Sequence, residues 1–248
     1  VLLEVEVSFH AVYGMSLNIV GIDPRFTIGD LAKQRQATIQ QLKNDGVMDM
    51  QRNLPLPSLL KRIAVISSND AAGYGDFCHQ LKNNNNGLHF HVQLFPALMQ
   101  GEQSPVSIIQ SLQQIADDMN SWDLVVIVRG GGATTDLRNF DNYELASHCA
   151  QFPLPIIAGI GHTRDISIVD MVVHTSVKTP TAAAEWIVGR MVGQAERINE
   201  LNERLKNAVK QSIFGQQQRL GNLLQSLRFI TQQRLYKQRT QLEKKKKT

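Results

Sequence analysis

Four short apolar runs, separated by longer amphipathic segments, constrain the fold of residues 61–180 more than any other feature of the sequence. The strand-like runs lie at 62–68, 89–95, 123–128 and 155–160, and the helix-like segments between them at 70–84, 105–120 and 140–151. Short and almost continuous apolar runs are typical of strands that are covered on both faces. Strands that alternate with helices predict a parallel sheet with right-handed crossovers. We therefore predict an α/β domain built on a doubly wound, mostly parallel sheet.

Other patterns precede this domain. Residues 1–22 alternate apolar and polar side chains and break at Gly14, which predicts a two-stranded hairpin. Residues 25–60 hold a helix that stops at Gly46 and then a proline-containing linker. The sequence opens with VLLEVEVSF, which has the pattern of mid-strand and lacks an initiator Met or a basic leader. We interpret the sequence as a fragment.

The C-terminal part predicts a very long helix. No proline occurs after Pro180, and apolar side chains recur there every three or four residues, at Met191, Ala195, Ile198, Leu201, Leu205, Ala208, Leu220, Leu223, Leu227 and Ile230. A 60-residue helix would be about 90 Å long. Its apolar stripe, which the glutamines at 216–218 interrupt, therefore needs a partner. The helix would either fold back on itself or coil with another chain.

Charge and cysteine content bear on partners and compartment. Of a net charge of +4, residues 181–248 contribute 14 Lys and Arg against 5 Asp and Glu, whereas the remaining residues carry 12 against 17. This asymmetry points to a polyanionic or acidic partner for the C-terminal part. Two cysteines, Cys78 and Cys149, are too few for a disulfide framework and suit the reducing cytoplasm, or are simple core residues. No apolar run reaches the roughly eighteen residues that a membrane span requires.

Polar residues gather after three of the four predicted strands. SSNDAAGYGD follows the first strand, RGGG the third and GIGHTRD the fourth. In doubly wound sheets, ligands bind outside the carboxyl ends of the strands. Glycines allow backbone N–H groups to approach an anion, and Arg129 offers forked donors that match phosphate oxygens. The three loops together predict a phosphate-binding active site.

Structural roles are the alternative for each of these residues. Gly130–Gly132 would also suit a tight turn from strand to helix, and Arg129 could pair with Asp136 or Asp141.

The same holds for the ionisable residues of the other loops. His162 could be a structural histidine, Asp165 could cap a helix that begins near Ile166, and Asp76 could lie in the first turn of its own helix. No metal site is predicted, because Asp76 and Asp165 come from separate loops and HTRD lacks the spacing of zinc ligands. AAGYGD is a poor match to the GxGxxG pattern of dinucleotide-binding sites.

The segments RGGGATTDLRNFD, PIIAGIGHTRD and VKTPTAAAE, in this order, resemble the large subunit of exodeoxyribonuclease VII, a bacterial nuclease specific for single-stranded DNA. LPLPSLLKRIAVISS is similar to the start of that family's nuclease domain, and the long helix is similar to its coiled-coil region. The resemblance implies four parts: a remnant of an N-terminal OB-fold at 1–24, a helix and linker at 25–60, the catalytic domain at 61–180 and the helical region at 181–248.

The resemblance also implies the site residues. The family's catalytic group falls on Asp76, Arg129, His162 and Asp165, and contacts to phosphate or DNA are expected at Ser67, Ser68, Gly130, Gly131, Gly132, Gly161 and Lys178. His162 would act as general acid and base with Asp165 orienting it, while Arg129 and the glycine amides would stabilise the phosphoryl oxygens.

This chemistry requires no metal cofactor, and Mg²⁺ held by Asp76 and Asp165 is the alternative. Two positions depart from the family pattern: Ala133 stands where many relatives have Ser, and Thr163 stands where His is more usually followed by Glu.

The implied activity is hydrolysis of single-stranded DNA from its ends, in the cytoplasm, to oligonucleotides and 5′-phosphomononucleotides. The implied partners are single-stranded DNA, small helical subunits along the long helix, and a second copy of the chain through the helical region, without a membrane. The alternative is a nucleotide or sugar-phosphate binding module with a helical oligomerisation stalk. Cleavage requires His162 within reach of the phosphate that Arg129 holds, whereas binding does not.

Overall fold

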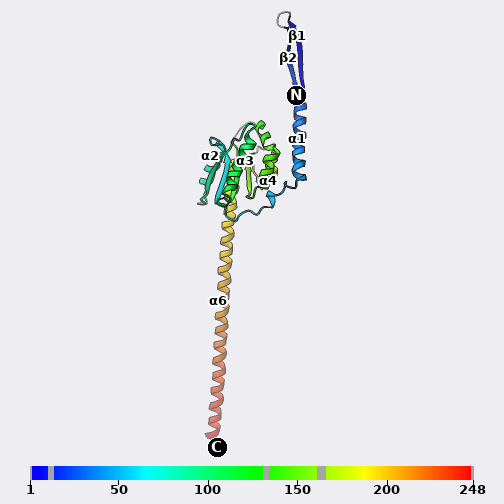
Figure 1. Cartoon of the computed structure of the whole chain (residues 1–248). Helices are drawn as coiled ribbons and strands as arrows, with labels where there is room; N and C mark the ends of the chain where they lie inside the picture. Colours follow the sequence, from blue (N-terminus) through cyan, green and yellow to red (C-terminus); the bar gives the residue numbers. More distant parts are fainter. Residues whose placement is uncertain (1, 11–13, 131–133, 161–165, 247–248) are drawn as a thin grey trace. The chain divides into compact units, whose positions relative to one another are not determined.

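The computed structural model describes residues 2–10, 14–130, 134–160 and 166–246 (Figure 1). The chain divides into two compact units, Val1–Val192 and Gly193–Thr248. Within the described residues, no helix combines the length and the apolar character needed to cross a membrane.

A five-stranded parallel sheet forms the centre of the first unit. Its strands, in spatial order, are β4 (His91–Pro96), β3 (Arg62–Ser67), β5 (Leu124–Val128), β6 (Ile156–Gly159) and β7 (Thr175–Ser176). The order of the strands reverses between β3 and β5, and such a switch point is where doubly wound sheets bind ligands. The predicted α/β class and its four strands are confirmed. The two-residue strand β7 was not predicted.

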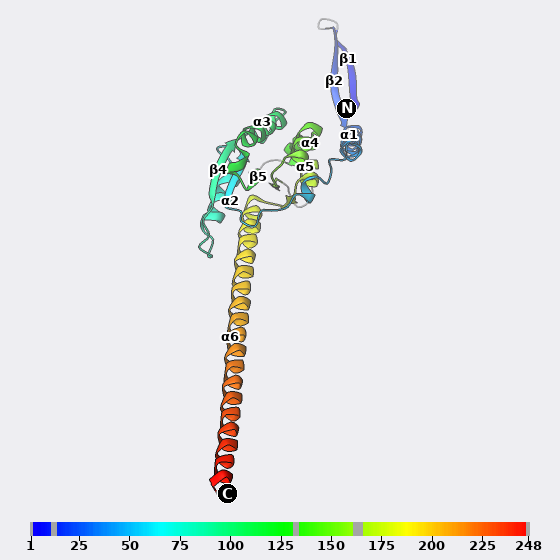
Figure 2. The same cartoon turned by 60° about the horizontal axis from the view of Figure 1, so that its bottom comes forward.

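Helices cover both faces of this sheet (Figure 2). They are α2 (Ala72–Lys82), α3 (Ser104–Asp117), α4 (Tyr143–Gln151), α5 (Ile168–Val172) and the first turns of α6 (Pro180–Lys246). Successive side chains of a strand point to opposite faces. Ala64 and Ile66 therefore pack with α3, α4 and α5, whereas Ile63 and Val65 pack with α2 and α6. The two layers make the sheet doubly wound, as predicted.

One cysteine belongs to the core of the first layer. Cys149 on α4 is buried, and burial raises the pKa of its thiol to about 12. Cys78 on α2 is half-buried, and both thiols are free. Cys149 is thus a core residue, which was one of the two interpretations of the cysteines.

The hairpin and helix predicted before the domain are present. β1 (Leu2–His10) pairs antiparallel with β2 (Gly14–Asp23), and α1 (Pro24–Asn44) follows. Gly46, at φ +70°, allows the chain to leave the helix in a left-handed conformation. A short 3₁₀ helix, η1 (Gln51–Asn53), then ties the linker to the domain. The buried amide of Gln51 donates to the carbonyl oxygens of Phe152 and Leu154, and its oxygen accepts from the Ile156 amide at 2.9 Å.

Helix α6 is continuous over 67 residues, so its length is about 100 Å. Of the two predicted arrangements, folding back within Pro180–Lys246 is therefore wrong. The prediction that Met191 belongs to the stripe is also wrong, because Met191 lies in the core beside Ala184 and Ile187. The remaining apolar stripe of α6 is more than half exposed at each of Ile198, Leu201, Leu205, Leu220, Leu223, Leu227 and Ile230.

Candidate active site at the carboxyl edge of the sheet

The carboxyl ends of β3, β5 and β6 meet at one edge of the sheet. Ile66 pairs with Ile127, and Val128 pairs with Gly159, so the three strands end in register. Arg129 follows β5 directly, is only 6% exposed, and its amide donates to the Gly159 carbonyl at 3.5 Å. A buried guanidinium thus lies at the switch point of the sheet, where the sequence predicted an anion-binding residue.

Helix α2 begins against the chain that follows β5. A Cβ atom on Gly73 would lie 2.7 Å from the Arg129 carbonyl oxygen and 2.9 Å from the Gly130 Cα atom, so no side chain fits there. A Cβ atom on Gly130 would in turn lie 3.3 Å from the Gly73 nitrogen. The AAGYGD segment thus packs its backbone closely against the chain after β5. Comparison with the dinucleotide-binding motif could not show this packing.

This contact puts the positive end of a helix beside Arg129. The N-cap residue of α2, Ala71, has no side chain that accepts hydrogen bonds from the first turn. The amides of that turn therefore lack a capping oxygen from the N-cap side chain. The N-terminus of a helix carries a partial positive charge that favours phosphate. Arg129 and the start of α2 both favour an anion at this edge.

The start of α6 is brought to the same edge through β6. A Cβ atom on Gly159 would lie 3.1 Å from the Thr179 carbonyl oxygen, so the two backbones pack closely here. The Thr179 hydroxyl caps α6 by accepting from the Ala182 amide at 3.1 Å. Lys178, a predicted DNA contact, precedes this cap and is exposed.

The two serines predicted to contact phosphate differ in their surroundings. Ser67, the last residue of β3, is fully buried, and its hydroxyl has no hydrogen-bond partner among the residues that the structure describes. By strand alternation its side chain shares the α2 and α6 side of the sheet with Val65. A buried hydroxyl without a partner costs about 1–3 kcal/mol, which a ligand oxygen would offset. Ser68 is half-buried, and its carbonyl accepts from the Ala71 amide.

The structure contradicts both predicted positions of Asp76, in the first turn of a helix and in a loop. It is the fifth residue of α2 and exposed, so the interpretation that it lies in the first turn is wrong, because the helix already begins at Ala72. It also belongs to a helix, and not to a loop. Residues three apart are neighbours on a helix surface, so Asp76 lies one turn beyond Gly73 on the side of α2 that meets Gly130.

Five of the predicted site residues lie outside the described residues: Gly131, Gly132, Gly161, His162 and Asp165. Their roles stay predictions. In the part of the chain that is described, no group of three or more His, Cys, Asp or Glu side chains could hold a metal ion.

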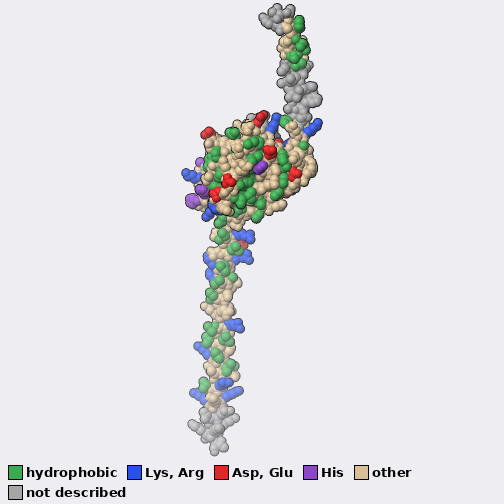
Figure 3. All heavy atoms as spheres, in the orientation of Figure 1, with side chains coloured by type: hydrophobic (Ala, Val, Ile, Leu, Met, Phe, Trp, Pro, Cys, Tyr) green, Lys and Arg blue, Asp and Glu red, His purple; other side chains and the backbone are tan. Residues whose placement is uncertain are grey.

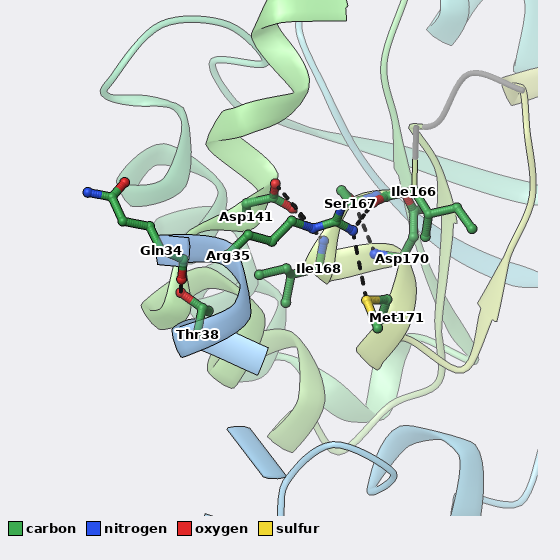
Figure 4. A network of polar contacts seen from close by, with 9 residues as sticks. All are labelled: Gln34, Arg35, Thr38, Asp141, Ile166, Ser167, Ile168, Asp170 and Met171. Carbon is green, nitrogen blue, oxygen red and sulfur yellow. Dashed lines mark hydrogen bonds and ion pairs between the residues drawn. The ribbon is translucent and has the colours of Figure 1, made fainter. Parts of the chain in front are cut away.

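The chain just after residues 161–165 is held by a network of polar contacts (Figure 4). Helix α5 begins at Ile168 with Ser167 as its N-cap, which corrects the interpretation of Asp165 as a cap near Ile166. The Ser167 hydroxyl accepts from the Asp170 amide, and the Asp170 carboxylate accepts from the Ser167 amide at 3.0 Å. This capping box, Ser-x-x-Asp, can be read from the sequence, and sequence analysis missed it.

Asp141 supplies a further contact to this segment. It ends the 3₁₀ segment η3 (Thr134–Asp141), and its Oδ1 atom accepts from the Ile168 amide at 2.7 Å. Its Oδ2 atom lies 3.7 Å from Nε of Arg35 on α1. Burial raises the pKa of the Asp141 carboxyl, while the Ile168 amide and Arg35 oppose that effect and Asp170 adds to it.

Comparison with known proteins places these elements in a family. The sequence profile of "Exonuclease VII, large subunit" matches residues 47–248. The chain belongs to the exonuclease VII large-subunit family. The match to this family includes all three strand-end loops and α6, and it begins before the predicted start of the catalytic domain at residue 61.

Several curated proteins named "Exodeoxyribonuclease 7 large subunit" are similar to the chain. The protein from Deinococcus radiodurans is 33% identical over 202 residues, which are 81% of this chain and 49% of that protein. The one from a Nostoc species is 39% identical over 193 residues, 76% of this chain and 45% of that protein. The one from Halalkalibacterium halodurans is 32% identical over 215 residues, 86% and 46% respectively. The chain thus spans about half the length of these exonuclease VII large subunits.

Proposed function

We propose that the chain hydrolyses phosphodiester bonds of single-stranded DNA as part of an exodeoxyribonuclease VII large subunit. It would act from strand ends and release oligonucleotides and 5′-phosphomononucleotides. The observation that carries this proposal is the packing of the α2 N-terminus on Arg129 and Gly130, at the switch point of a sheet in a member of this family. The free thiols of Cys78 and Cys149 support action in the reducing cytoplasm.

The phosphate-holding groups lie within the described residues. Arg129 offers a forked pair of donors to two phosphoryl oxygens. The first turn of α2, which packs against the Gly130 backbone, adds the positive end of a helix dipole beside Arg129, and this charge would stabilise the transition state. The buried Ser67 hydroxyl is a further donor for a phosphate oxygen.

Proton transfer is assigned to His162 through the family resemblance. An imidazole changes its charge near neutral pH, so it can activate water and protonate the leaving oxygen. Asp165 would orient the imidazole.

We propose that the positive charge of Arg129 and of the α2 terminus replaces that of a metal ion. Mg²⁺ held by Asp76 and Asp165 is the alternative. Digestion of end-labelled single-stranded DNA with and without EDTA decides between them.

The exposed side chains of α6 indicate which partners the chain would bind. Figure 3 shows Lys and Arg side chains interspersed with hydrophobic side chains along this helix. We propose that the exposed stripe receives the small subunits of exodeoxyribonuclease VII, and that the basic side chains bind the DNA phosphates. A second copy of the chain would bind through the same helical region.

Substitution of two site residues tests the proposal. His162→Ala should lower hydrolysis by about 100- to 10,000-fold, because it removes a general acid and base, while the folded protein still binds single-stranded DNA. Arg129→Lys should also be severely impaired, because an ammonium group cannot reproduce the forked contact. Rates would be measured on a full-length large subunit with its small subunit. Wild-type rates from His162→Ala would reject the mechanism, and DNA binding without any cleavage by the wild-type protein would favour the binding module.

A further inference from the structure

Two consecutive peptide groups directly after residues 161–165 are held by three side chains from different places in the chain (Figure 4). The Ile166 carbonyl accepts from Nη2 of Arg35. The Ser167 amide donates to Asp170, and the Ile168 amide donates to Asp141. Side chains thus fix the course of the backbone at the point where the predicted HTRD segment ends.

Two of these side chains come from outside α5. Arg35 lies on α1, and Asp141 ends η3, the segment that continues from the RGGG sequence after β5. Arg35 and Asp141 also contact each other, with 3.7 Å between Nε and Oδ2. The backbone at 166–168 is therefore tied to the chain that carries Arg129 and, through Arg35, to the helix that precedes the domain.

The contact between Arg35 and Asp141 contributes little to the stability of the fold. The capping box of Ser167 and Asp170 already caps α5 without Arg35 or Asp141. The side chain of Arg35 is 39% exposed and that of Asp141 is 25% exposed. Although burial raises the pKa of Asp141, both side chains are partly exposed and their ion pair is long at 3.7 Å, so the ion pair itself contributes little to folding. What the pair adds is a defined position for one stretch of backbone.

We infer that Arg35 and Asp141 are positioning residues for DNA hydrolysis. They fix the backbone at 166–168, which follows His162 and Asp165 in the sequence, and they link it to η3, which follows Arg129 in the sequence. The inference rests on the proposed function, since it assumes that His162 acts on a phosphate that Arg129 holds. A displacement of a catalytic group by about 1 Å lowers the rate by about 100-fold, so a loss of this link would lower turnover much more than it lowers stability.

The test compares three variants of a full-length large subunit assembled with its small subunit. Arg35→Gln and Asp141→Ala should each lower kcat on single-stranded DNA by about 10- to 100-fold, with KM, DNA affinity and melting temperature near wild type. Asp141→Asn keeps an oxygen that accepts from the Ile168 amide, so it should recover much of the activity that Asp141→Ala loses.

Arg52→Gln is the matched control. Arg52 also donates to a backbone carbonyl of α5, that of Met171 at 3.0 Å, and it pairs with Asp49 at 3.3 Å. Within the described residues, Arg52 makes no hydrogen bond or ion pair with the backbone at 166–168, so Arg52→Gln should keep the wild-type kcat. 

Each contrary result has a distinct meaning. Wild-type kcat from Arg35→Gln and Asp141→Ala, with an inactive His162→Ala, overturns the positioning role and leaves the proposed function in place. A loss of activity that is matched by unfolding also overturns it, because the role would then be structural. A fully active His162→Ala rejects the proposed function itself, and the inference with it.

Discussion

Gly73 shows what a missing side chain does at the site. The atoms that a Cβ at this position would meet, 2.7–2.9 Å away, belong to the backbone of Arg129 and Gly130 and cannot rotate aside. Gly73→Ala must therefore move α2 away from the glycine loop. We expect a loss of about 1–3 kcal/mol in the free energy of unfolding, as is typical of overpacking, together with a large loss of DNA hydrolysis.

Gly75, two residues further along α2, is the control for this substitution. A Cβ atom there would have no heavy atom within 4 Å. Because alanine is the better helix former, Gly75→Ala should raise stability by about 0.5–1 kcal/mol. Urea denaturation measures both changes, and equal stability of the two variants would contradict the packing role of Gly73.

Arg129 and Gly73 differ in whether their positions in the fold could be predicted from the sequence. Arg129 could be assigned because an apolar run ends directly before it, so its place at a strand end is local information. The importance of Gly73 depends on contact with Gly130, far along the chain, and no local pattern reports it. The contacts of Asp141 were likewise hidden, because its partners Arg35 and Ile168 come from other elements.

At the scale of elements, Asp123 joins the starts of β3 and β5. Its carboxylate accepts from the amides of Lys61 and Arg62 at 3.0 and 2.9 Å and from the Arg62 guanidinium at 2.6 Å. Burial acts to raise the pKa of Asp123, but the hydrogen bonds from Arg62 and Lys61 outweigh it and lower the pKa. The contribution of this carboxylate to stability is therefore present above its unfolded pKa of about 3.9, and it is lost as the pH falls through the lower folded pKa.

Asp123→Asn tests this linkage. The variant should unfold at lower urea than the wild type at pH 7, because a neutral amide cannot replace the charge-assisted bonds to Arg62. The difference should shrink as the pH falls below the folded pKa, where the wild-type carboxyl is also neutral. A difference in urea midpoint that stays constant from pH 7 to strongly acidic solution would contradict it.

The length of an element decided whether it could be predicted. The strands β3 to β6 are apolar runs covered by helices on both faces, so they could be read directly from the sequence. β7 has only two residues, too few to show a period, and the helix expected to begin near Ile166 is the five-residue α5, which begins two residues later. Their positions are set by tertiary contacts, such as the hydrogen bond of Ser176 to Asp170 at 2.8 Å.

At the scale of the whole molecule, the apolar stripe of α6 predicts association. Leu220 and Leu227 are each 60% exposed. Burial of one leucine contributes about 1.5–3 kcal/mol, so the isolated chain should self-associate through the stripe. Replacing both leucines with Asp should release monomer, and in the full enzyme it should abolish binding of the small subunit.

The control variant also introduces two negative charges, but on the opposite side of α6. Gln218 and Gln225 have the same seven-residue spacing, and at 3.6 residues per turn they lie opposite Leu220 and Leu227. Of the glutamines at 216–218, Gln218 therefore does not interrupt the stripe, which corrects the prediction. Gln218→Asp with Gln225→Asp should leave association unchanged in light scattering. A wild-type chain that stays monomeric at high concentration with α6 intact would show that the stripe does not drive self-association.

The packing of α6 on the sheet has a consequence during protein synthesis. Ala183, Ala184, Ile187 and Met191 cover the same sheet face as Ile63 and Val65 of β3. The ribosome makes Met191 more than a hundred residues after it finishes β3 at Ser67. At about 5–20 residues per second, this interval lasts roughly 6–25 s. Until Met191 is made, the α6 residues that cover this face of the sheet are missing, so we expect chaperones at the ribosome exit to bind the apolar side chains of β3.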